Sequence, residues 1–465
     1  MNNILEKIEI IDAGSEGNAV ARQGDMVIFV PYGVPGDVVD IHIFKSKRSY
    51  AEGRIVKFHS YSENRNEPFC SHFGVCGGCK WQHMNYKTQL HFKQKQVGDS
   101  FKRIAKLENP LIRDILGSEQ IQGYRNKLEF TFSSRRWFTG PDTGEASPAL
   151  GFHIPRRWDK VLDIDHCFLM SEPVNAIRLE ARRYSIEKGL SYYDARNNSG
   201  FMRNMILRST TGGDLMLILV FGADEPDRIL PMLYHLQSAF PAITSMFYVV
   251  NEKKNDIIND LEMRYYSGTR FITETMLPFR KNNKKVSFRI GPVSFFQTNP
   301  VQAGNLFRLA AEYLSPKGHE VVYDLYTGAG AIANYISPYV SKVIGIESVA
   351  SAVADAGINS EINSNTNLHF FAAEAEKLLT PEFISANGHP DAVITDPPRN
   401  GMHEKVIQTL LSVLPQKIIY VSCNPATQAR DIFLLKQRYN LEECRPVDMF
   451  PHTQHVENVA LLTLA

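Results

Sequence analysis

Four short apolar runs in the last third of the chain each lead to a side chain that is able to do chemistry. Asp324 and Glu347 lie at the ends of two such runs, in VVYDLYTGAG and KVIGIE. Asp396 and Cys423 follow the other two, in DAVITDPPRNG and KIIYVSCNPAT. Such runs predict buried parallel strands, and open α/β sheets bind ligands at the carboxyl ends of their strands. The pattern therefore predicts an enzyme with its active site in this part of the chain.

A glycine-rich turn, DLYTGAGAIA, follows the first of these runs and indicates a cofactor site. Gly328 and Gly330 allow the backbone to approach a ligand closely. Glu347 ends the next strand about twenty residues later, where an acidic side chain would hold ribose hydroxyls. NAD and S-adenosylmethionine both suit such a crevice. The Asp-Pro-Pro of DPPRNG favours S-adenosylmethionine, because this tripeptide at a strand end is a feature of nucleic-acid base methyltransferases.

Two further motifs supply a candidate nucleophile and a candidate base. The Asn-Pro dipeptide after Cys423 must end the strand, so the thiol would face the crevice, and nearby helix amides would favour the reactive thiolate. FPHTQHVENVALL carries His452, His455 and Glu457 before a final apolar run. Since no obvious third metal ligand accompanies the two histidines, we expect them to orient neighbours or form hydrogen bonds. Glu457 is the candidate general base.

Three cysteines stand close together in CSHFGVCGGCKWQHM, where glycines would let the loop turn around a metal centre. These are Cys70, Cys76 and Cys79, with the spacing C-x5-C-x2-C. Cys167, in DHCFLM, is the obvious fourth thiolate, although Cys444 is also available. Four thiolates satisfy either zinc or an iron–sulfur cluster.

The composition is that of a globular protein of two or three domains: 465 residues, 43% hydrophobic and 22% charged. The chain has no apolar run long enough for a membrane span, and MNNILEKIEI lacks a signal-peptide core, so we expect a cytoplasmic protein. The net charge of +1 hides a basic stretch from Lys80 to Arg136, where twelve Lys or Arg against five Asp or Glu give +7. This surplus indicates phosphate contacts with a nucleic acid.

The elements that would position these residues predict a multidomain fold. Residues 1–58 hold short strands broken by Gly and Pro, which indicates a small, OB-like β-barrel. Residues 59–290 hold the cysteine loop, a helical stretch over 85–120, and a mixture of strands and helices typical of an α+β domain. We expect part of 85–120 to pack on the last domain. In that domain, residues 291–465, strands alternate with helix-length segments, as in a doubly wound, Rossmann-like α/β sheet.

The order of these motifs resembles that of the RNA uracil-C5 methyltransferases, specifically the iron–sulfur-containing branch that modifies 23S ribosomal RNA. The resemblance runs nearly end to end. EGNAVAR and VIFVPYGVPGD are similar to the family's TRAM domain, an RNA-binding barrel, and CSHFGVCGGCKWQHM is similar to its cluster loop. GYRNKLEF and GFH are similar to motifs of its central iron–sulfur domain. The methyltransferase motifs then follow in order: SFFQTNP, DLYTGAG, IGIE, DPPRNG, VSCNP and FPHTQHVE.

The resemblance implies a role for each site residue. Cys423 would be the nucleophile and Glu457 the base, whereas Thr327, where the family usually has Cys, has no nucleophilic role. Five residues would lie around S-adenosylmethionine and the target base: Gln297, Tyr326, Glu347, Asp396 and, through a looser match of FFAAEAEK, Glu374. Four cysteines would bind a 4Fe–4S cluster in preference to zinc: Cys70, Cys76, Cys79 and Cys167.

The implied reaction is methylation of C5 of one uridine in 23S rRNA through a covalent adduct between Cys423 and C6. The protein would act as a monomer with RNA as its partner and no membrane. One alternative is the same chemistry on a T-loop uridine of tRNA. Two others are a non-catalytic RNA-binding protein of ribosome assembly and an NAD-dependent oxidoreductase.

Overall fold

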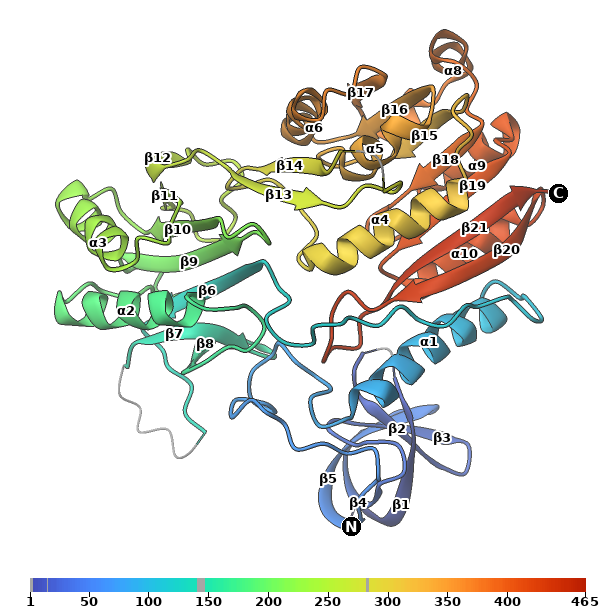
Figure 1. The fold of residues 1–465 in the computed structure, drawn as a ribbon. Coiled ribbons are helices and arrows are strands. Elements are labelled where there is room, and N and C mark those ends of the chain that lie inside the picture. Colours follow the sequence, from blue (N-terminus) through green and yellow to red (C-terminus); the bar gives the residue numbers. More distant parts are fainter. Residues whose placement is uncertain (1–2, 15, 140–146, 282–283) are drawn as a thin grey trace.

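The computed structural model describes residues 3–14, 16–139, 147–281 and 284–465. Residues 1–2, 15, 140–146 and 282–283, which belong to the predicted domains, lie outside the described residues. Figure 1 shows, along the chain, a barrel, a central sheet, a small two-stranded sheet and a C-terminal sheet. Helix α1 (Tyr86–Arg103) lies between the barrel and the C-terminal sheet.

The barrel is closed and has the strand order β1-β2-β3-β5-β4. Its interior is filled by small and β-branched side chains, among them Ile10, Val30 and Ile41, all fully buried. Closure leaves no free strand edge along which another chain could pair. The prediction of a small N-terminal barrel is confirmed. Its strands are β1 (Ile4–Ala13), β2 (Ala19–Gln23), β3 (Met26–Val30), β4 (Val38–Ser46) and β5 (Tyr50–Ser60).

Helix α1 begins at Asn85, whose side chain accepts a hydrogen bond from the backbone N–H of Thr88 at 2.9 Å. Its buried face packs on α10 (Pro425–Leu435) of the C-terminal sheet. The prediction of helix over 85–120 is wrong beyond Arg103, since the following segment forms extended bridges with β20 (Tyr439–Val447). Lys106, three residues after the last helical residue, has a left-handed φ of 55°, and Pro110 disfavours helix at Asn109, so the helix does not resume in this segment.

The central region is an α+β arrangement, as predicted. A seven-stranded mixed sheet has the order β12-β11-β10-β9-β6-β7-β8, and helices α2 (Val174–Glu187) and α3 (Pro226–Ala239) pack on it. The strands are β6 (Lys127–Ser133), β7 (Ala149–Ile154), β8 (Arg157–Asp163), β9 (Met202–Ser209), β10 (Leu215–Phe221), β11 (Ser245–Val250) and β12 (Arg264–Gly268). A two-stranded sheet, β13 (Ile272–Met276) and β14 (Val286–Ile290), shares one hydrophobic core with the C-terminal region.

The C-terminal sheet has the order β17-β16-β15-β18-β19-β21-β20. Its first five strands run parallel, and β21 runs antiparallel to both of its neighbours. The strands are β15 (Val321–Leu325), β16 (Lys342–Glu347), β17 (Leu368–Ala372), β18 (Ala392–Thr395), β19 (Lys417–Ser422), β20 and β21 (Glu457–Leu464). The helices are α4 (Pro300–Leu314), α5 (Ala331–Ile336), η1 (Ser337–Tyr339), α6 (Ala350–Ile362), α7 (Ala375–Leu378), α8 (Pro381–Asn387), α9 (Glu404–Val413) and α10.

Both faces of this sheet are covered. Val322 packs into the core on the side of α4 and α5, whereas its neighbour Tyr323 packs into the core on the side of α1, α9 and α10. This alternation explains why the strands read as unbroken apolar runs in the sequence. The doubly wound arrangement predicted for this region is confirmed.

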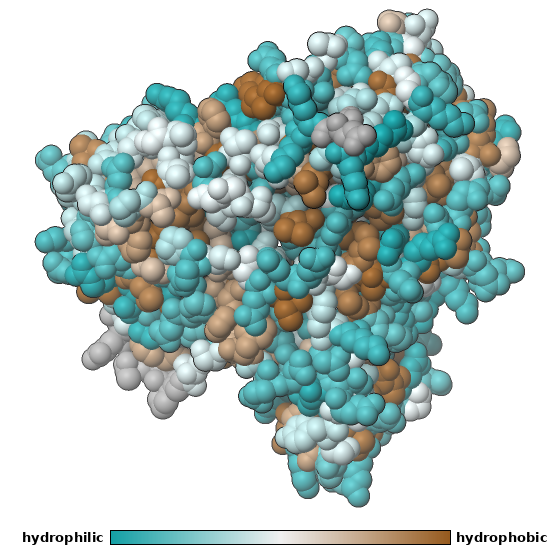
Figure 2. All heavy atoms as spheres, viewed as in Figure 1, coloured by the Kyte–Doolittle hydropathy of each residue, from teal (hydrophilic) through white to brown (hydrophobic). Residues whose placement is uncertain are grey.

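Polar residues cover much of the face in Figure 2, with apolar residues in scattered groups. Among the described residues, no helix is both long enough and apolar enough to cross a membrane.

Candidate active site and cysteine pocket

The carboxyl edge of the C-terminal sheet gathers the residues predicted for the active site. Asp324 lies near the end of β15, Glu347 ends β16, and Asp396 follows β18. Cys423 directly follows β19, and Glu457 begins the antiparallel strand β21 beside it. The candidate nucleophile and the candidate base therefore lie at adjacent strand ends, on the same edge of the sheet as Asp324.

The acidic side chains along this edge interact with one another. Burial raises the pKa of Asp324, and the charge of Glu347 raises it further. Burial and then Asp324 raise the pKa of Asp396, while burial and then Asp396 raise that of Glu457. Each carboxyl thus resists ionisation first because it is buried and then because its neighbours are also acidic. A crevice of this kind is suited to a ligand that carries a positive charge.

The Cys423 thiol is not activated in the free protein. Burial, followed by the charges of Glu457 and Asp396, raises its pKa to about 11, and the positive charge of Arg399 opposes this rise. The prediction that helix amides would favour the thiolate is therefore wrong for the free protein, because burial and two carboxyls outweigh them. Activation requires a further positive charge or a proton acceptor in the assembled complex.

Arg399 is a site residue that the motif analysis did not single out, although it stands in DPPRNG three positions after Asp396. Its charge lowers the pKa values of both Cys423 and Glu457. Its backbone carbonyl accepts hydrogen bonds from Asn424 Nδ2 at 2.9 Å and from Thr427 Oγ1 at 3.2 Å. These bonds tie the loop after β18 to the loop that carries the thiol.

The glycine-rich turn has two different reasons for its glycines. A Cβ at Gly330 would come within 2.9 Å of the Ala356 side chain, so this glycine serves packing. A Cβ at Gly328 would meet nothing within 4 Å, and its φ is +56°, so this position offers open space beside the backbone. The Gly328 N–H donates to Glu347 Oε2 at 3.1 Å. The turn and the end of β16 are thereby joined, as a cofactor site between them requires.

The remaining predicted cofactor residues lie at different depths. Tyr326 is half-buried directly after β15, with a left-handed φ of 62°. Thr327, beside it, donates to Asp324 Oδ2 at 2.5 Å, which is a structural role. Glu374 is exposed after β17 and pairs with Lys377 at 2.5 Å. Gln297 lies outside the sheet between β14 and α4, where its carbonyl accepts from a side chain of the central region.

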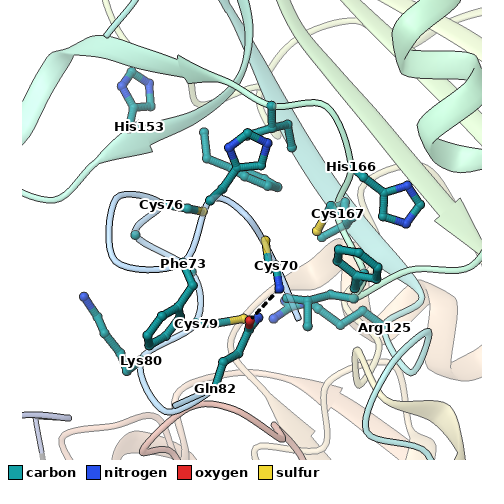
Figure 3. Close-up of a pocket in the computed structure, with 18 of the residues that line it drawn as sticks. Cys70, Phe73, Cys76, Cys79, Lys80, Gln82, Arg125, His153, His166 and Cys167 are labelled. Atoms are coloured by element: carbon teal, nitrogen blue, oxygen red, sulfur yellow. Dashed lines mark hydrogen bonds between the residues drawn. The ribbon is translucent and has the colours of Figure 1, made fainter. Parts of the chain in front are cut away.

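The cysteine loop and the segment that carries Cys167 meet at one cavity of about 600 Å³. Figure 3 shows Cys70, Cys76, Cys79 and Cys167 around it, with the backbone N–H of Cys70 bonded to Gln82. Burial, and the proximity of the other thiols, raise the pKa of Cys79 to about 12 and that of Cys167 to about 11.

Cys444 is not the fourth member of this set, because it lies on β20 in the core on the α1 side of the C-terminal sheet. Across the described ranges, no three His, Cys, Asp or Glu side chains are arranged so that they could hold a metal ion. Zinc requires its thiolates within about 2.3 Å of one point. The four thiols line one cavity, but among the described residues no three of them come close enough together to share an ion.

Comparisons with known proteins identify the family of the chain. A family profile described as tRNA (Uracil-5-)-methyltransferase matches residues 262–464, and a TRAM domain profile matches residues 6–56. An uncharacterized RNA methyltransferase of Bacteroides thetaiotaomicron is 48% identical over 458 residues, covering 97% of this chain and 99% of its own. Another, from Chlorobaculum tepidum, is 38% identical over 467 residues, covering 98% of this chain and 93% of its own.

A solved structure is similar over nearly the whole chain. It is the Pyrococcus abyssi tRNA (uracil-54, C5)-methyltransferase in complex with S-adenosyl-L-homocysteine, with a TM-score of 0.75 and 29% identity, covering 98% of this chain and 99% of that one. The site residues lie at strand ends, and the full-length relatives and both profiles agree on the family. The chain is an RNA methyltransferase of the RNA uracil-5-methyltransferase family with an N-terminal TRAM domain.

Proposed function

We propose that the protein transfers the methyl group of S-adenosylmethionine to C5 of a specific uridine in 23S ribosomal RNA. The observation that carries the proposal is the pairing of a thiol and a carboxyl, Cys423 and Glu457, at adjacent strand ends of an acidic crevice. A soft nucleophile that can depart and a base beside it are the two groups that methylation of an electron-poor ring carbon requires.

The cofactor supplies an electrophilic methyl group on a sulfonium, whose positive charge suits this edge. The full-length structural relative was solved with the demethylated product of this cofactor. Tyr326, Glu347 and Asp396 lie along the edge where the cofactor and the target base would meet, and the open space at Gly328 adjoins it. Gln297 and Glu374 complete the proposed set from outside the sheet and from the loop after β17.

Uracil C5 is not nucleophilic enough to accept a methyl group unaided. The Cys423 sulfur adds to C6, and the electron pair of the C5–C6 double bond moves into an enolate that makes C5 nucleophilic. C5 then takes the methyl group, while the electron pair of the broken S–CH3 bond stays on the departing cofactor sulfur. Glu457 removes the proton from C5, and elimination of the Cys423 thiolate restores the ring.

The elevated pKa of Glu457 suits this step. Burial and the charge of Asp396 raise it, so the carboxylate is a stronger base than an exposed glutamate. Asp396 and Gln297 would hydrogen-bond the uracil edge, and a uridine in folded RNA must leave its stack to reach them.

The TRAM barrel and the basic stretch from Lys80 to Arg136, apart from the buried Lys93, would hold the RNA around the target by shape and phosphate contacts. The cysteine pocket would hold a 4Fe–4S cluster through Cys70, Cys76, Cys79 and Cys167, and the resemblance of this loop to the ribosomal branch favours 23S rRNA. The second candidate is tRNA, which the names of the matched profile and of the structural relative favour.

We propose domain boundaries at about residues 58 and 290, although one hydrophobic core extends across the boundary at 290.

The test is methyl transfer from labelled S-adenosylmethionine to purified 23S rRNA and, separately, to bulk tRNA, both prepared without uracil-C5 methylation. We expect label on the ribosomal RNA, mapped to one 5-methyluridine. Label on tRNA alone would keep the chemistry and overturn the proposed substrate. Label on neither RNA, with the cofactor bound, would overturn the proposed activity on these substrates.

A further inference from the structure

The connection between β20 and β21, residues 448–456, leads directly into the proposed base. Val447 and Glu457 pair across the antiparallel strands, so this segment closes the sheet beside the nucleophile. Within itself the segment is held by a turn, in which the N–H and Oγ1 of Thr453 both donate to the Phe450 carbonyl. Its shape is set mainly by contacts from other parts of the chain.

Helix α1 supplies the first group of these contacts. Lys93 Nζ pairs with Asp448 Oδ1 at 2.5 Å, and both side chains are fully buried. Lys93 also donates to the Phe450 carbonyl at 2.9 Å, and Tyr86 donates to Asp448 Oδ2 at 2.8 Å. A buried charge pair with additional hydrogen bonds fixes the start of the segment relative to the helix.

Gln89, on the same helix, holds the middle of the segment. It is 1% exposed, and its Oε1 accepts a hydrogen bond from the His452 backbone N–H at 2.9 Å. Its Nε2 donates to the carbonyls of Trp81 at 2.9 Å and Met84 at 2.8 Å. His452 has a φ of 66°, a left-handed conformation that is unfavourable for a residue with a Cβ. Such a conformation persists only when neighbouring groups hold it.

The cysteine loop holds the same residue from the other side. The backbone N–H groups of Lys80 and Trp81, which directly follow Cys79, both donate to the His452 carbonyl, at 2.8 and 3.0 Å. The Phe69 ring packs edge-on against the His452 ring at 5.0 Å. His452 therefore contacts both helix α1 and the loop that carries the cysteines. It lies five residues before Glu457 in the sequence.

We propose that Gln89 is a positioning residue for Glu457. By joining His452 to the backbone of the cysteine loop, it sets the path of the 448–456 segment and hence the placement of the base against C5 of the target uracil. Gln89 touches neither substrate nor the reacting atoms, so it acts on the proton-removal step through the segment. This inference rests on the proposed function.

The variant that tests it is Gln89→Leu, which has a side chain of similar size and removes the hydrogen bonds to His452, Trp81 and Met84. The matched control is Gln94→Leu on the same helix, whose side chain accepts instead from the backbone N–H of Ile115 at 2.9 Å. Each variant is assayed for turnover, for KM, and for RNA–protein adduct that survives denaturing electrophoresis. The substrate is whichever unmethylated RNA, 23S rRNA or tRNA, the wild-type protein methylates.

We expect Gln89→Leu to lower kcat by about 10- to 100-fold, because displacement by about an ångström has effects of this size, with KM within about twofold of the wild-type value. The covalent adduct should accumulate, since addition to C6 and methyl transfer precede the impaired step. Gln94→Leu should show neither effect. Loss of adduct in parallel with turnover would show general damage to the fold and overturn the proposal, as would wild-type behaviour of Gln89→Leu.

Two further variants keep the outcome interpretable. Gln89→Glu retains an oxygen that accepts from the His452 backbone N–H. Its adduct level should therefore lie between those of the wild type and Gln89→Leu. If Gln89→Leu does not fold, a wild-type adduct level in Gln89→Glu overturns the proposal. Glu457→Gln must itself trap the adduct. If it does not, the base assignment of the proposed function fails, whereas a trapped adduct in Glu457→Gln with a normal Gln89→Leu defeats only the positioning role.

Discussion

Binding of S-adenosylmethionine should activate Cys423 through charge alone. The thiol lies in a crevice where burial, Glu457 and Asp396 raise its pKa to about 11. S-adenosylhomocysteine has the same adenosine and amino-acid groups as the cofactor but lacks the sulfonium charge. The two ligands therefore isolate the electrostatic effect of the sulfonium on the thiol from the effect of filling the site.

The size of the effect follows from the pKa. At pH 8 a thiol with a pKa of about 11 is ionised in about one molecule in a thousand. An opposite charge placed within about 4–6 Å lowers a pKa by about 1–3 units. A shift of about one unit raises the thiolate fraction about tenfold, and alkylation, which requires the thiolate, should accelerate by the same factor.

The assay is the rate of iodoacetamide alkylation at Cys423, followed by mass spectrometry of the peptide that contains it, between pH 7 and pH 10. The free protein should show a rate that rises about tenfold per pH unit across this range, since the pKa lies above it. S-adenosylmethionine should increase the rate at pH 8, and S-adenosylhomocysteine should not. Cys444 is buried on β20 and serves as an internal control.

Equal rates with the two ligands would refute the idea that the sulfonium activates the thiol. A rate that already levels off near pH 8 in the free protein would refute the elevated pKa itself. In that case the thiol would have to be less buried than in the structure, or less affected by Glu457 and Asp396.

Three other changes have defined outcomes. Cys423→Ala should abolish methyl transfer while calorimetry still detects cofactor binding; residual turnover near the wild-type rate would contradict the covalent mechanism. Lys93→Met leaves the charge of Asp448 buried without its partner and should lower the free energy of unfolding by about 3–5 kcal/mol, measured by urea denaturation; adding Asp448→Asn should recover most of the loss. Cys76→Ser should lose iron and brown colour after anaerobic preparation, whereas Cys444→Ser should keep both.

Patterns of neighbouring residues were enough to predict the strands of the barrel and of the C-terminal sheet. The alternating strands of the barrel and the apolar strands that end at Asp324, Glu347, Asp396 and Cys423 were all located from residue order. The helix expected over 85–120 was too long, because the bridges that extend the chain after Arg103 come from β20, more than three hundred residues away. No periodicity within the stretch contains that information.

The electrostatics of the site could not be predicted for the same reason. The expectation of a favoured thiolate at Cys423 considered the helix that follows it. Burial of the thiol, and then the charges of Glu457 and Asp396 from other parts of the sheet, raise its pKa instead. Likewise, spacing could not choose between Cys167 and Cys444 as the fourth thiol, because the choice depends on which cavity each side chain faces. Arg399 had no distinguishing feature in the sequence apart from its place in DPPRNG.

The anchoring of the 448–456 segment also has a consequence for biosynthesis. The hydrogen bond between Gln89 and His452 spans 363 residues of sequence, and the pair between Lys93 and Asp448 spans 355. At about 5–20 residues per second, the ribosome adds the later partner roughly 20 to 70 seconds after the earlier one. The barrel is able to close long before helix α1 gains these partners. The 448–456 segment therefore gains these anchors only after the first and last parts of the chain have met.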